Sequence, residues 1–179
     1  MSLGINYAWV SGSELEKVDP SLGLRARGAM HVFSQVSACA SLAYNASSVE
    51  GQVVQLMDRY VRLDRRSGNV VGDVQFIRFG LGARVDAAST EEWKYRPYAL
   101  VELLYAHSEL TLDSVDGEPP AQGIVPFSQW KLGVLGEAGM DFGLTPNFGI
   151  ETCFAYEILE FPAGSMFLAS LQAGATYRF

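Results

Sequence analysis

The sequence predicts an all-β fold, an eight-stranded antiparallel up-and-down barrel that crosses a membrane. The C-terminal segment 166–179 alternates: every second residue back from Phe179 is apolar, with aromatic side chains at both ends of that face, and the other face is mostly small, polar or charged. Aromatic rings at both ends of an apolar face are typical of a strand that reaches both membrane interfaces. Seven further segments alternate similarly, and long connections alternate with short ones.

The eight predicted strands follow from the period-two alternation of apolar and polar residues. They cover 3–11, 22–34, 36–46, 70–86, 96–110, 129–143, 147–160 and 166–179. Connections after the second, fourth and sixth strands are short or moderate, whereas long loops lie at about 12–21, 47–69 and 111–128. Outer-membrane barrels have this asymmetry. We therefore expect one barrel domain over 1–179, with both termini at the short-turn end.

Alternate residues of a strand face opposite sides of the sheet, and we call each of the two sets a parity. One parity of the strands is apolar and carries no formal charge. Taken in order, it holds Leu3, Ile5, Tyr7 and Trp9; Ala38, Ala40, Leu42 and Tyr44; Ile77, Phe79, Leu81, Ala83 and Val85; Ala99, Val101, Leu103 and Tyr105; Trp130, Leu132, Val134, Gly136, Ala138, Met140 and Phe142; Phe148, Ile150, Thr152, Phe154, Tyr156 and Ile158. Its end aromatics predict an outer girdle and an inner girdle at the membrane interfaces. The outer girdle comprises Trp9, Tyr44, Tyr105, Trp130, Tyr156 and Phe167, and the inner girdle comprises Phe142, Phe148, Tyr177 and Phe179.

The opposite parity collects the charges of the strands. It holds Arg25, Arg27, Arg78, Arg84, Glu102, Lys131, Glu137, Asp141, Glu151, Glu157 and Arg178. An eight-stranded barrel is just wide enough for its side chains to fill it, and a buried unpaired charge is very costly. We therefore predict a lumen filled by ion pairs, in which Glu102, Glu137 and Glu151 pair with Arg78, Arg84 and Arg178.

A soluble eight-stranded barrel of lipocalin type is the alternative fold. It would need the reverse polarity, with an apolar cavity and a charged exterior. The charged parity here also contains glycines that make room for long neighbouring side chains, namely Gly80, Gly82, Gly133, Gly139 and Gly174. This pattern favours the membrane barrel.

Composition narrows the function classes. Hydrophobic residues make up 49% of the chain, yet no apolar run approaches the roughly 18–20 residues of a membrane helix. The net charge of −7 argues against nucleic acid as a partner. Cys39 and Cys153 are too few for a disulfide scaffold. No signal-peptide pattern is present, so we expect a mature form of the chain.

Three short segments resemble the OmpA-like and opacity-type family of outer-membrane β-barrel proteins. They are the closing segment 173–179 (AGATYRF), the opening of the fifth strand at 96–98 (RPY), and the turn 143–147 (GLTPN) that leads into Phe148 and Gly149. The resemblance implies a multi-pass barrel in the bacterial outer membrane. The terminal aromatic also resembles the signal that the barrel-assembly machinery recognises, which implies that Tyr177 and Phe179 serve that role.

Candidate catalytic groups are few. His107, Ser108 and Glu109 lie near the outer end of the fifth strand, and some outer-membrane barrels modify lipids with a histidine and a serine. Adjacent strand residues point to opposite faces, so His107 cannot easily activate Ser108. His31 with the two cysteines is a poor zinc set, because structural zinc sites usually have close ligand pairs. We therefore predict no enzymatic activity, no metal and no cofactor.

The second long loop concentrates positive charge on an acidic protein. Arg59, Arg62, Arg65 and Arg66 lie within eight residues that contain a single aspartate. Charge-assisted hydrogen bonds could hold the phosphates of lipopolysaccharide or a sulfated glycan. The alternative is a solvated loop, or a hairpin that extends the barrel. The third long loop is acidic and could pair with the arginines.

Together these observations favour a monomeric, non-enzymatic outer-membrane barrel. It would contribute to envelope integrity, and its loops would bind lipopolysaccharide, a host surface or a glycan. The expected partners are membrane lipid, lipopolysaccharide and the barrel-assembly machinery, with no nucleic acid. The alternative function is a small porin-like solute channel, and an outer-membrane lipid-modifying enzyme is a remote third.

Overall fold

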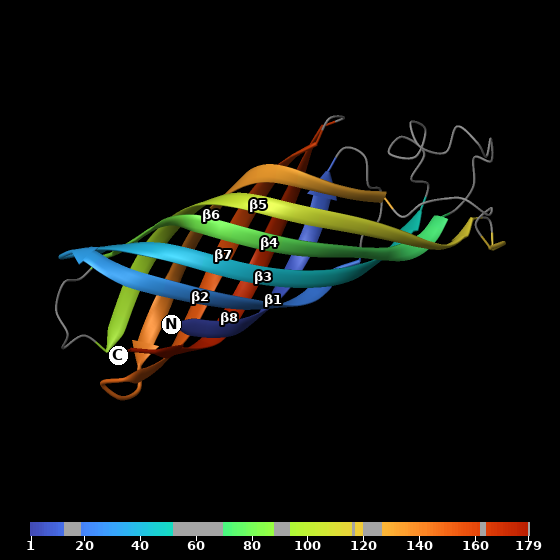
Figure 1. The fold of residues 1–179 in the computed structure, drawn as a ribbon. Coiled ribbons are helices and arrows are strands. Elements are labelled where there is room, and N and C mark those ends of the chain that lie inside the picture. Colours follow the sequence, from blue (N-terminus) through green and yellow to red (C-terminus); the bar gives the residue numbers. More distant parts are fainter. Residues whose placement is uncertain are drawn as a thin grey trace.

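The chain forms a closed antiparallel β-barrel in which each strand pairs with its neighbours in sequence order (Figure 1). This computed structural model describes residues 1–12, 19–51, 70–87, 94–115, 117–119, 127–161 and 164–178. Pairing of β1 with β8, from Ser2 against Thr176 to Gly12 against Met166, closes the barrel. The predicted fold class is confirmed. The strands are β1 (Ser2–Gly12), β2 (Ser21–Phe33), β3 (Val36–Gly51), β4 (Val70–Asp86), β5 (Tyr95–Val115), β6 (Phe127–Gly143), β7 (Phe148–Phe161) and β8 (Gly164–Tyr177).

The strand ends differ from the predicted boundaries mainly at the loop end. β3 continues to Gly51 and β5 to Val115, whereas the sequence predicted ends at 46 and 110. Both extensions are held by β4, because Val70 pairs with Gly51 on one side and with Val115 on the other. The predicted long loops 47–69 and 111–128 were therefore too long, since backbone pairing persists where the side-chain alternation fades.

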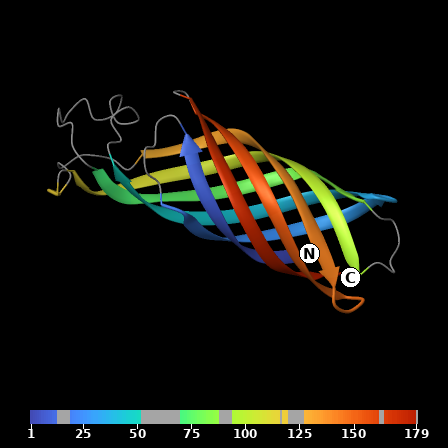
Figure 2. The same cartoon turned by 180° about the vertical axis from the view of Figure 1, so that it is seen from behind.

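Both termini lie at the same end of the barrel (Figures 1 and 2). The turns 34–35 and 144–147 lie at this end too, and backbone hydrogen bonds tie it together. The Met1 ammonium donates to the Tyr177 carbonyl at 2.8 Å, and the Arg178 amide donates to the Asn147 carbonyl at 2.8 Å. We call this the terminal end, and the opposite end the loop end.

The outer wall is an apolar belt. Leu81, Leu103 and Leu132 point outward with 68–70% of their surfaces exposed, and Leu3, Leu24 and Leu171 are more than half exposed. A continuous apolar surface of this extent marks a contact with lipid or protein. No helix in the described part of the chain is long and apolar enough to cross a membrane.

Aromatic side chains lie at both edges of this belt. Toward the loop end, Trp9, Tyr44, Tyr105, Trp130 and Tyr156 are all exposed, and Tyr156 stacks on Phe167 with ring centroids 6.0 Å apart. Toward the terminal end, Phe142 packs edge-on against Tyr95 at 5.7 Å, and Phe148 and Tyr177 are exposed. Tyr95 and Tyr105 are ten positions apart on β5. That spacing matches the roughly 9–11 residues that a tilted strand needs to cross a bilayer.

The interior has two layers. Toward the loop end, the lumen holds buried apolar side chains, among them Phe76, Leu104, Leu159 and Leu168, each at most 3% exposed, together with a small polar cluster described below. Toward the terminal end, the lumen holds arginines and carboxylates that are at most 9% exposed. Charges inside and leucines outside reverse the polarity of a soluble barrel, which excludes the lipocalin-type alternative.

Candidate functional site

Glu137 on β6 is the centre of a buried ion-pair network in the lumen. Arg27 binds both of its carboxylate oxygens, with Nη1 donating to Oε1 at 2.9 Å and Nη2 to Oε2 at 2.5 Å. Arg25 donates to Oε2 at 2.9 Å, and the Tyr98 hydroxyl donates to Oε1 at 2.7 Å. One carboxylate thus links three neighbouring side chains from β2 and β5.

Glu102 on β5 extends the network toward the middle of the barrel. Its Oε2 accepts from Arg25 at 2.6 Å and from the Ser41 hydroxyl at 2.7 Å. Glu102 has no exposed surface. A Cβ at Gly80 would lie 2.5 Å from that same oxygen and from the Ser41 Oγ, so a larger residue there would force these two side chains to move.

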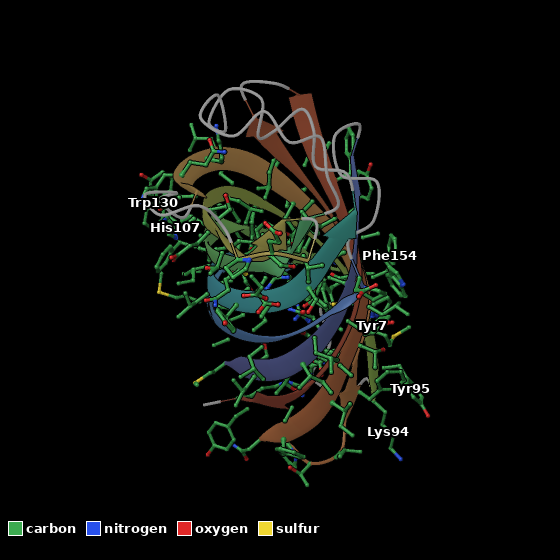
Figure 3. The ribbon with its side chains drawn as sticks, turned by 90° about the vertical axis from the view of Figure 1, so that its right-hand side faces the viewer. Tyr7, Lys94, Tyr95, His107, Trp130 and Phe154 are labelled. Carbon is green, nitrogen blue, oxygen red and sulfur yellow. The ribbon has the colours of Figure 1, made fainter. Side chains whose placement is uncertain are left out.

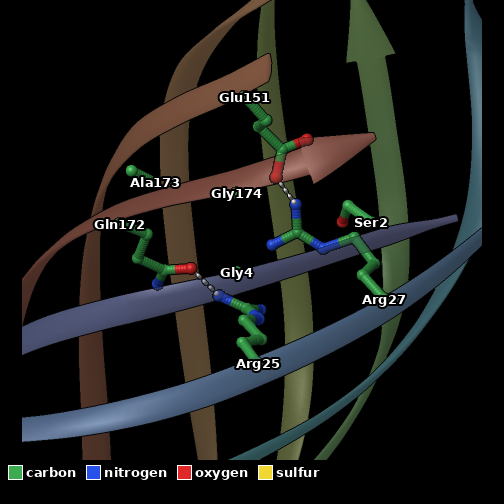
Figure 4. Close-up of a pocket in the computed structure, with 8 residues that line it drawn as sticks. All are labelled: Ser2, Gly4, Arg25, Arg27, Glu151, Gln172, Ala173 and Gly174. Atoms are coloured by element: carbon green, nitrogen blue, oxygen red, sulfur yellow. Dashed lines mark hydrogen bonds and ion pairs between the residues drawn. The ribbon is translucent and has the colours of Figure 1, made fainter. Parts of the chain in front are cut away.

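Toward the terminal end the network continues through Glu151 and Arg84. Glu151 contacts Arg27 at 3.4 Å and Arg84 at 3.0 Å. Arg84 also contacts Asp86 at 2.7 Å, and Arg178 reaches Asp141 at 2.7 Å. The Arg84 guanidinium lies 3.9 Å from the centroid of the Tyr98 ring, a cation–π contact. Figure 4 shows Arg27 against Glu151 and Arg25 against Gln172 in this part of the lumen.

A separate pair lies closer to the loop end. Arg78 donates to Glu157 at 2.5 Å and also to the side-chain oxygen of Asn45. Asn45 in turn donates to the Asn6 side chain at 2.6 Å. This polar cluster lies on β1, β3, β4 and β7, so it ties together walls of the barrel that do not all pair directly.

The structure assigns the predicted charges to different partners. Only the pair of Glu151 with Arg84 matches the expectation; Arg78 takes Glu157, Arg178 takes Asp141, and Arg25 and Arg27 hold Glu102 and Glu137. The staggered register of the closed barrel sets which residues share a level, and strand parity alone does not contain it. Lys131 lies on the same parity, half-buried, six positions along β6 from Glu137.

A vestibule of about 470 Å³ opens at the terminal end. Its lining includes Arg84, Arg96, Arg178, Asp141 and His31. A second gap of about 10 Å³ lies beneath Gly4 and Gly174 beside Arg25 and Arg27 (Figure 4). That volume is at the lower limit for one water molecule. Arg27 and Glu151 line both the vestibule and this small gap.

One group of metal-ligand type lies in the described lumen. Ligand atoms of Glu137, Glu151 and Cys153 all lie within 4.8 Å of one another. Arg27 contacts both of these carboxylates, so its positive charge occupies the place that a cation would take. This group is best understood as part of the ion-pair network. Cys39 and Cys153 are both buried free thiols, and neither is in a disulfide.

The outer wall carries a hydrogen bond that sequence reasoning missed. His107 Nε2 lies 2.7 Å from Ser128 Oγ, and its ring lies against Trp130 with centroids 4.6 Å apart. Figure 3 places His107 and Trp130 side by side near the loop end. In the sequence, His107 is adjacent to Ser108, which points into the lumen and was rejected as its partner. The contact of His107 with Ser128 across the β5–β6 ladder could be found only from the register.

Two predicted sites lie outside the described residues. The anion-binding arginines Arg59, Arg62, Arg65 and Arg66 belong to the segment 52–69, and Phe179 follows the last described residue. Tyr177, the other residue of the assembly signal, ends β8 on the outer wall, where it is 49% exposed.

Comparisons with known proteins match the fold but not the sequence. No protein-family model matches the chain, and no curated protein matches it in sequence. Among solved structures, Ail, the attachment invasion locus protein of Yersinia pestis, in complex with the heparin analogue sucrose octasulfate, is 18% identical with a TM-score of 0.60. Neisserial surface protein A is 15% identical with a TM-score of 0.66, and the outer membrane protein OprG of Pseudomonas aeruginosa is 14% identical with a TM-score of 0.63.

Each of these three alignments covers 99% of this chain and 95% of the other. The outer membrane enzyme PagL also matches, at 10% identity and a TM-score of 0.52 over 97% of this chain and 98% of that one. At such identities the similarity shows a shared fold. Together with the apolar outer wall, it supports the predicted membrane location. The chain therefore has the fold of the eight-stranded β-barrels of the bacterial outer membrane.

Proposed function

We propose that the protein is a non-conducting barrel of the outer membrane that contributes to envelope integrity and presents its loops as a binding surface for anionic glycans or lipopolysaccharide. The observation that carries the first half is the filled lumen. Buried apolar side chains and the polar cluster of Arg78, Glu157, Asn45 and Asn6 occupy the loop half of the described lumen. Nine charged residues of the network occupy the terminal half: Arg25, Arg27, Arg84, Arg178, Asp86, Glu102, Glu137, Asp141 and Glu151. This role requires no catalysis.

The proposal that the loops bind an anionic ligand rests on the positive charge of the second long loop. The loop arginines carry a local positive excess on a chain of net charge −7. Ail, which has the same fold, was solved with the polysulfated heparin analogue sucrose octasulfate. Sulfates and phosphates are the groups that a planar guanidinium binds through two parallel hydrogen bonds. A sulfated glycan or a lipid phosphate is therefore the ligand class we assign to this loop.

A small solute channel is the second candidate, and the terminal vestibule favours it. The vestibule is lined by Arg27 and Glu151 as well as by Arg84 and Asp141. Passage further would need Arg27 to leave both Glu137 and Glu151. The conductance measurement that ends the Discussion separates a channel from a filled barrel.

Replacing Arg59, Arg62, Arg65 and Arg66 together with glutamine should weaken binding to heparin or to lipopolysaccharide while the barrel still folds. The reason is the loss of charge-assisted contacts to sulfate or phosphate. Binding by the unaltered protein should also fall as salt rises, because exposed charges are screened over about 8–10 Å at physiological ionic strength. A four-lysine variant is the matched control and should recover only part of the binding. Equal binding by all three proteins across a salt series would leave this loop without an anion site.

Deleting Phe179 should slow membrane insertion and leave the protein aggregated in the periplasm. This residue ends the segment that resembles the assembly signal, and its aromatic ring is expected at the inner interface. The measurement is the fraction of heat-modifiable protein in isolated outer membranes. Phe179→Tyr, which keeps an aromatic terminus, serves as the matched control and should insert normally. Normal outer-membrane levels of the deletion variant would remove the terminal residue from the assembly step.

A further inference from the structure

A hydrogen-bonded histidine and serine lie on the outer wall at the edge of the apolar belt. His107 Nε2 and Ser128 Oγ are 2.7 Å apart, which is the reach at which a histidine can activate a serine hydroxyl. Ser128 is an exposed residue on the outer wall of the barrel. Glu109 follows on the same face of β5 and is paired in register with Ser128, so this face also carries a carboxylate.

The height of this pair in the membrane follows from the outer girdle. His107 lies two residues beyond Tyr105, and Ser128 two residues beyond Trp130, in both cases toward the loop end. Two residues of strand correspond to roughly 6–7 Å along the strand. Because girdle aromatics lie at the interface between hydrocarbon and headgroups, the pair lies at the level of the headgroups.

The wall below the pair is suited to hold acyl chains. Phe79 and Trp130 stack with centroids 6.4 Å apart, and Tyr105 stacks on Trp130 at 4.6 Å. Deeper along the same strands, Leu103 and Leu132 expose 70% and 68% of their surfaces. A lipid whose chains lie along this wall presents its carboxylic ester bonds at the boundary between chain and headgroup, roughly 6–7 Å along the strand from His107 and Ser128.

We propose that Ser128 and His107 are a nucleophile and its general base, and that they transfer acyl groups from the carboxylic esters of outer-leaflet lipids to water. This activity goes beyond the proposed structural role. His107 Nε2 takes the hydroxyl proton while Ser128 Oγ bonds to the ester carbonyl carbon. The C–O bond to the lipid alcohol then breaks, and the alcohol leaves with that proton. Water hydrolyses the acyl-serine in the same way, which releases a carboxylic acid and restores the serine hydroxyl.

The first test uses the folded protein in detergent micelles and a fluorophosphonate probe, which labels serines activated as nucleophiles. Labelling should occur at Ser128, as located by peptide mass spectrometry, and should be lost in Ser128→Ala. His107→Gln should lower the labelling rate by about 100-fold or more, the usual contribution of a positioned general base. Heat-modifiable migration shows that each variant is folded. Absence of label from folded protein, or equal labelling of the His107→Gln variant, would overturn the proposal.

Two control variants replace a serine and a histidine that are not paired with each other. Ser48 is an exposed serine near the loop end whose hydroxyl donates to Asp73 at 3.1 Å, so Ser48→Ala should leave the labelling unchanged. His31 is an exposed histidine at the other end of the barrel, and His31→Gln should also have no effect. Loss of labelling in either control would show that the probe reports on the fold, which would contradict the assignment to Ser128.

The second test separates the two sources of lipid esters. The folded protein is reconstituted once with lipopolysaccharide and once with diacyl phospholipid vesicles, and released fatty acids are measured. Release from either lipid that depends on both Ser128 and His107 supports the proposal and identifies the substrate. Lack of release from both lipids, with Ser128 also unlabelled, would leave this hydrogen bond as part of the aromatic interface.

Discussion

Replacing Glu137 with alanine is expected to lower the free energy of unfolding by about 3–5 kcal/mol, because it removes the carboxylate that the buried Arg25 and Arg27 share. Arg27 would lose both of its shortest contacts, and Arg25 and Tyr98 would each lose one. Glu102 and Glu151 cannot take the place of Glu137, because they already bind these arginines. The measurement is urea unfolding of the protein reconstituted in lipid vesicles.

Glu118→Ala is the control for this prediction. Glu118 carries the same carboxylate but is exposed beyond the end of β5, where a single ion pair contributes about 0–1 kcal/mol. Equal losses of stability in the two variants would show that the lumen charges are hydrated and that the ion-pair network does not stabilise the barrel.

Gly82→Ala should prevent β4 and β5 from pairing normally. A Cβ at this position would lie 1.9 Å from the Val101 carbonyl oxygen and 2.7 Å from the Glu102 Cα. Both atoms belong to the backbone of the neighbouring strand, so no side-chain rotation relieves the clash. We expect a destabilisation of at least about 1–3 kcal/mol, the usual effect of overpacking, together with a smaller heat-modifiable fraction after refolding.

Gly136→Ala provides a control of the same chemistry. Gly136 points outward on β6, and a Cβ there meets no atom within 4 Å. Its replacement should be neutral or should stabilise the barrel by up to about 1 kcal/mol, because glycine loses more backbone freedom on folding than alanine does. If both alanine variants fold and unfold alike, the close approach of β4 and β5 at Gly82 is wrong.

The fold could be predicted from the sequence because its main determinant is local. Alternation with period two is visible in each strand, and the positions of Trp130 and Phe142 on one face of 129–143 already predict a membrane crossing. The ends of the strands were harder to predict from the sequence. β3 and β5 extend past the membrane, where pairing depends on backbone hydrogen bonds that any side chain permits.

The details of the site were less accessible because they depend on register across the barrel. Parity places Arg25 and Glu137 inside, but only the stagger of eight strands brings β2 level with β6. The same limit hid the contact of His107 with Ser128. These residues are separated by 21 positions in the chain, and their proximity follows from the pairing of Glu109 with Ser128 in the β5–β6 hairpin.

Single-channel recording in a planar bilayer tests most directly the central claim that the lumen is filled. Barrels reconstituted from purified, heat-modifiable protein should leave the current at baseline, with at most rare small openings. The physical reason is that an ion would have to displace Arg27 from Glu137 and pass the apolar layer at Phe76 and Leu104. A steady conductance that increases by one equal step for each inserted barrel would contradict the filled lumen and establish the channel.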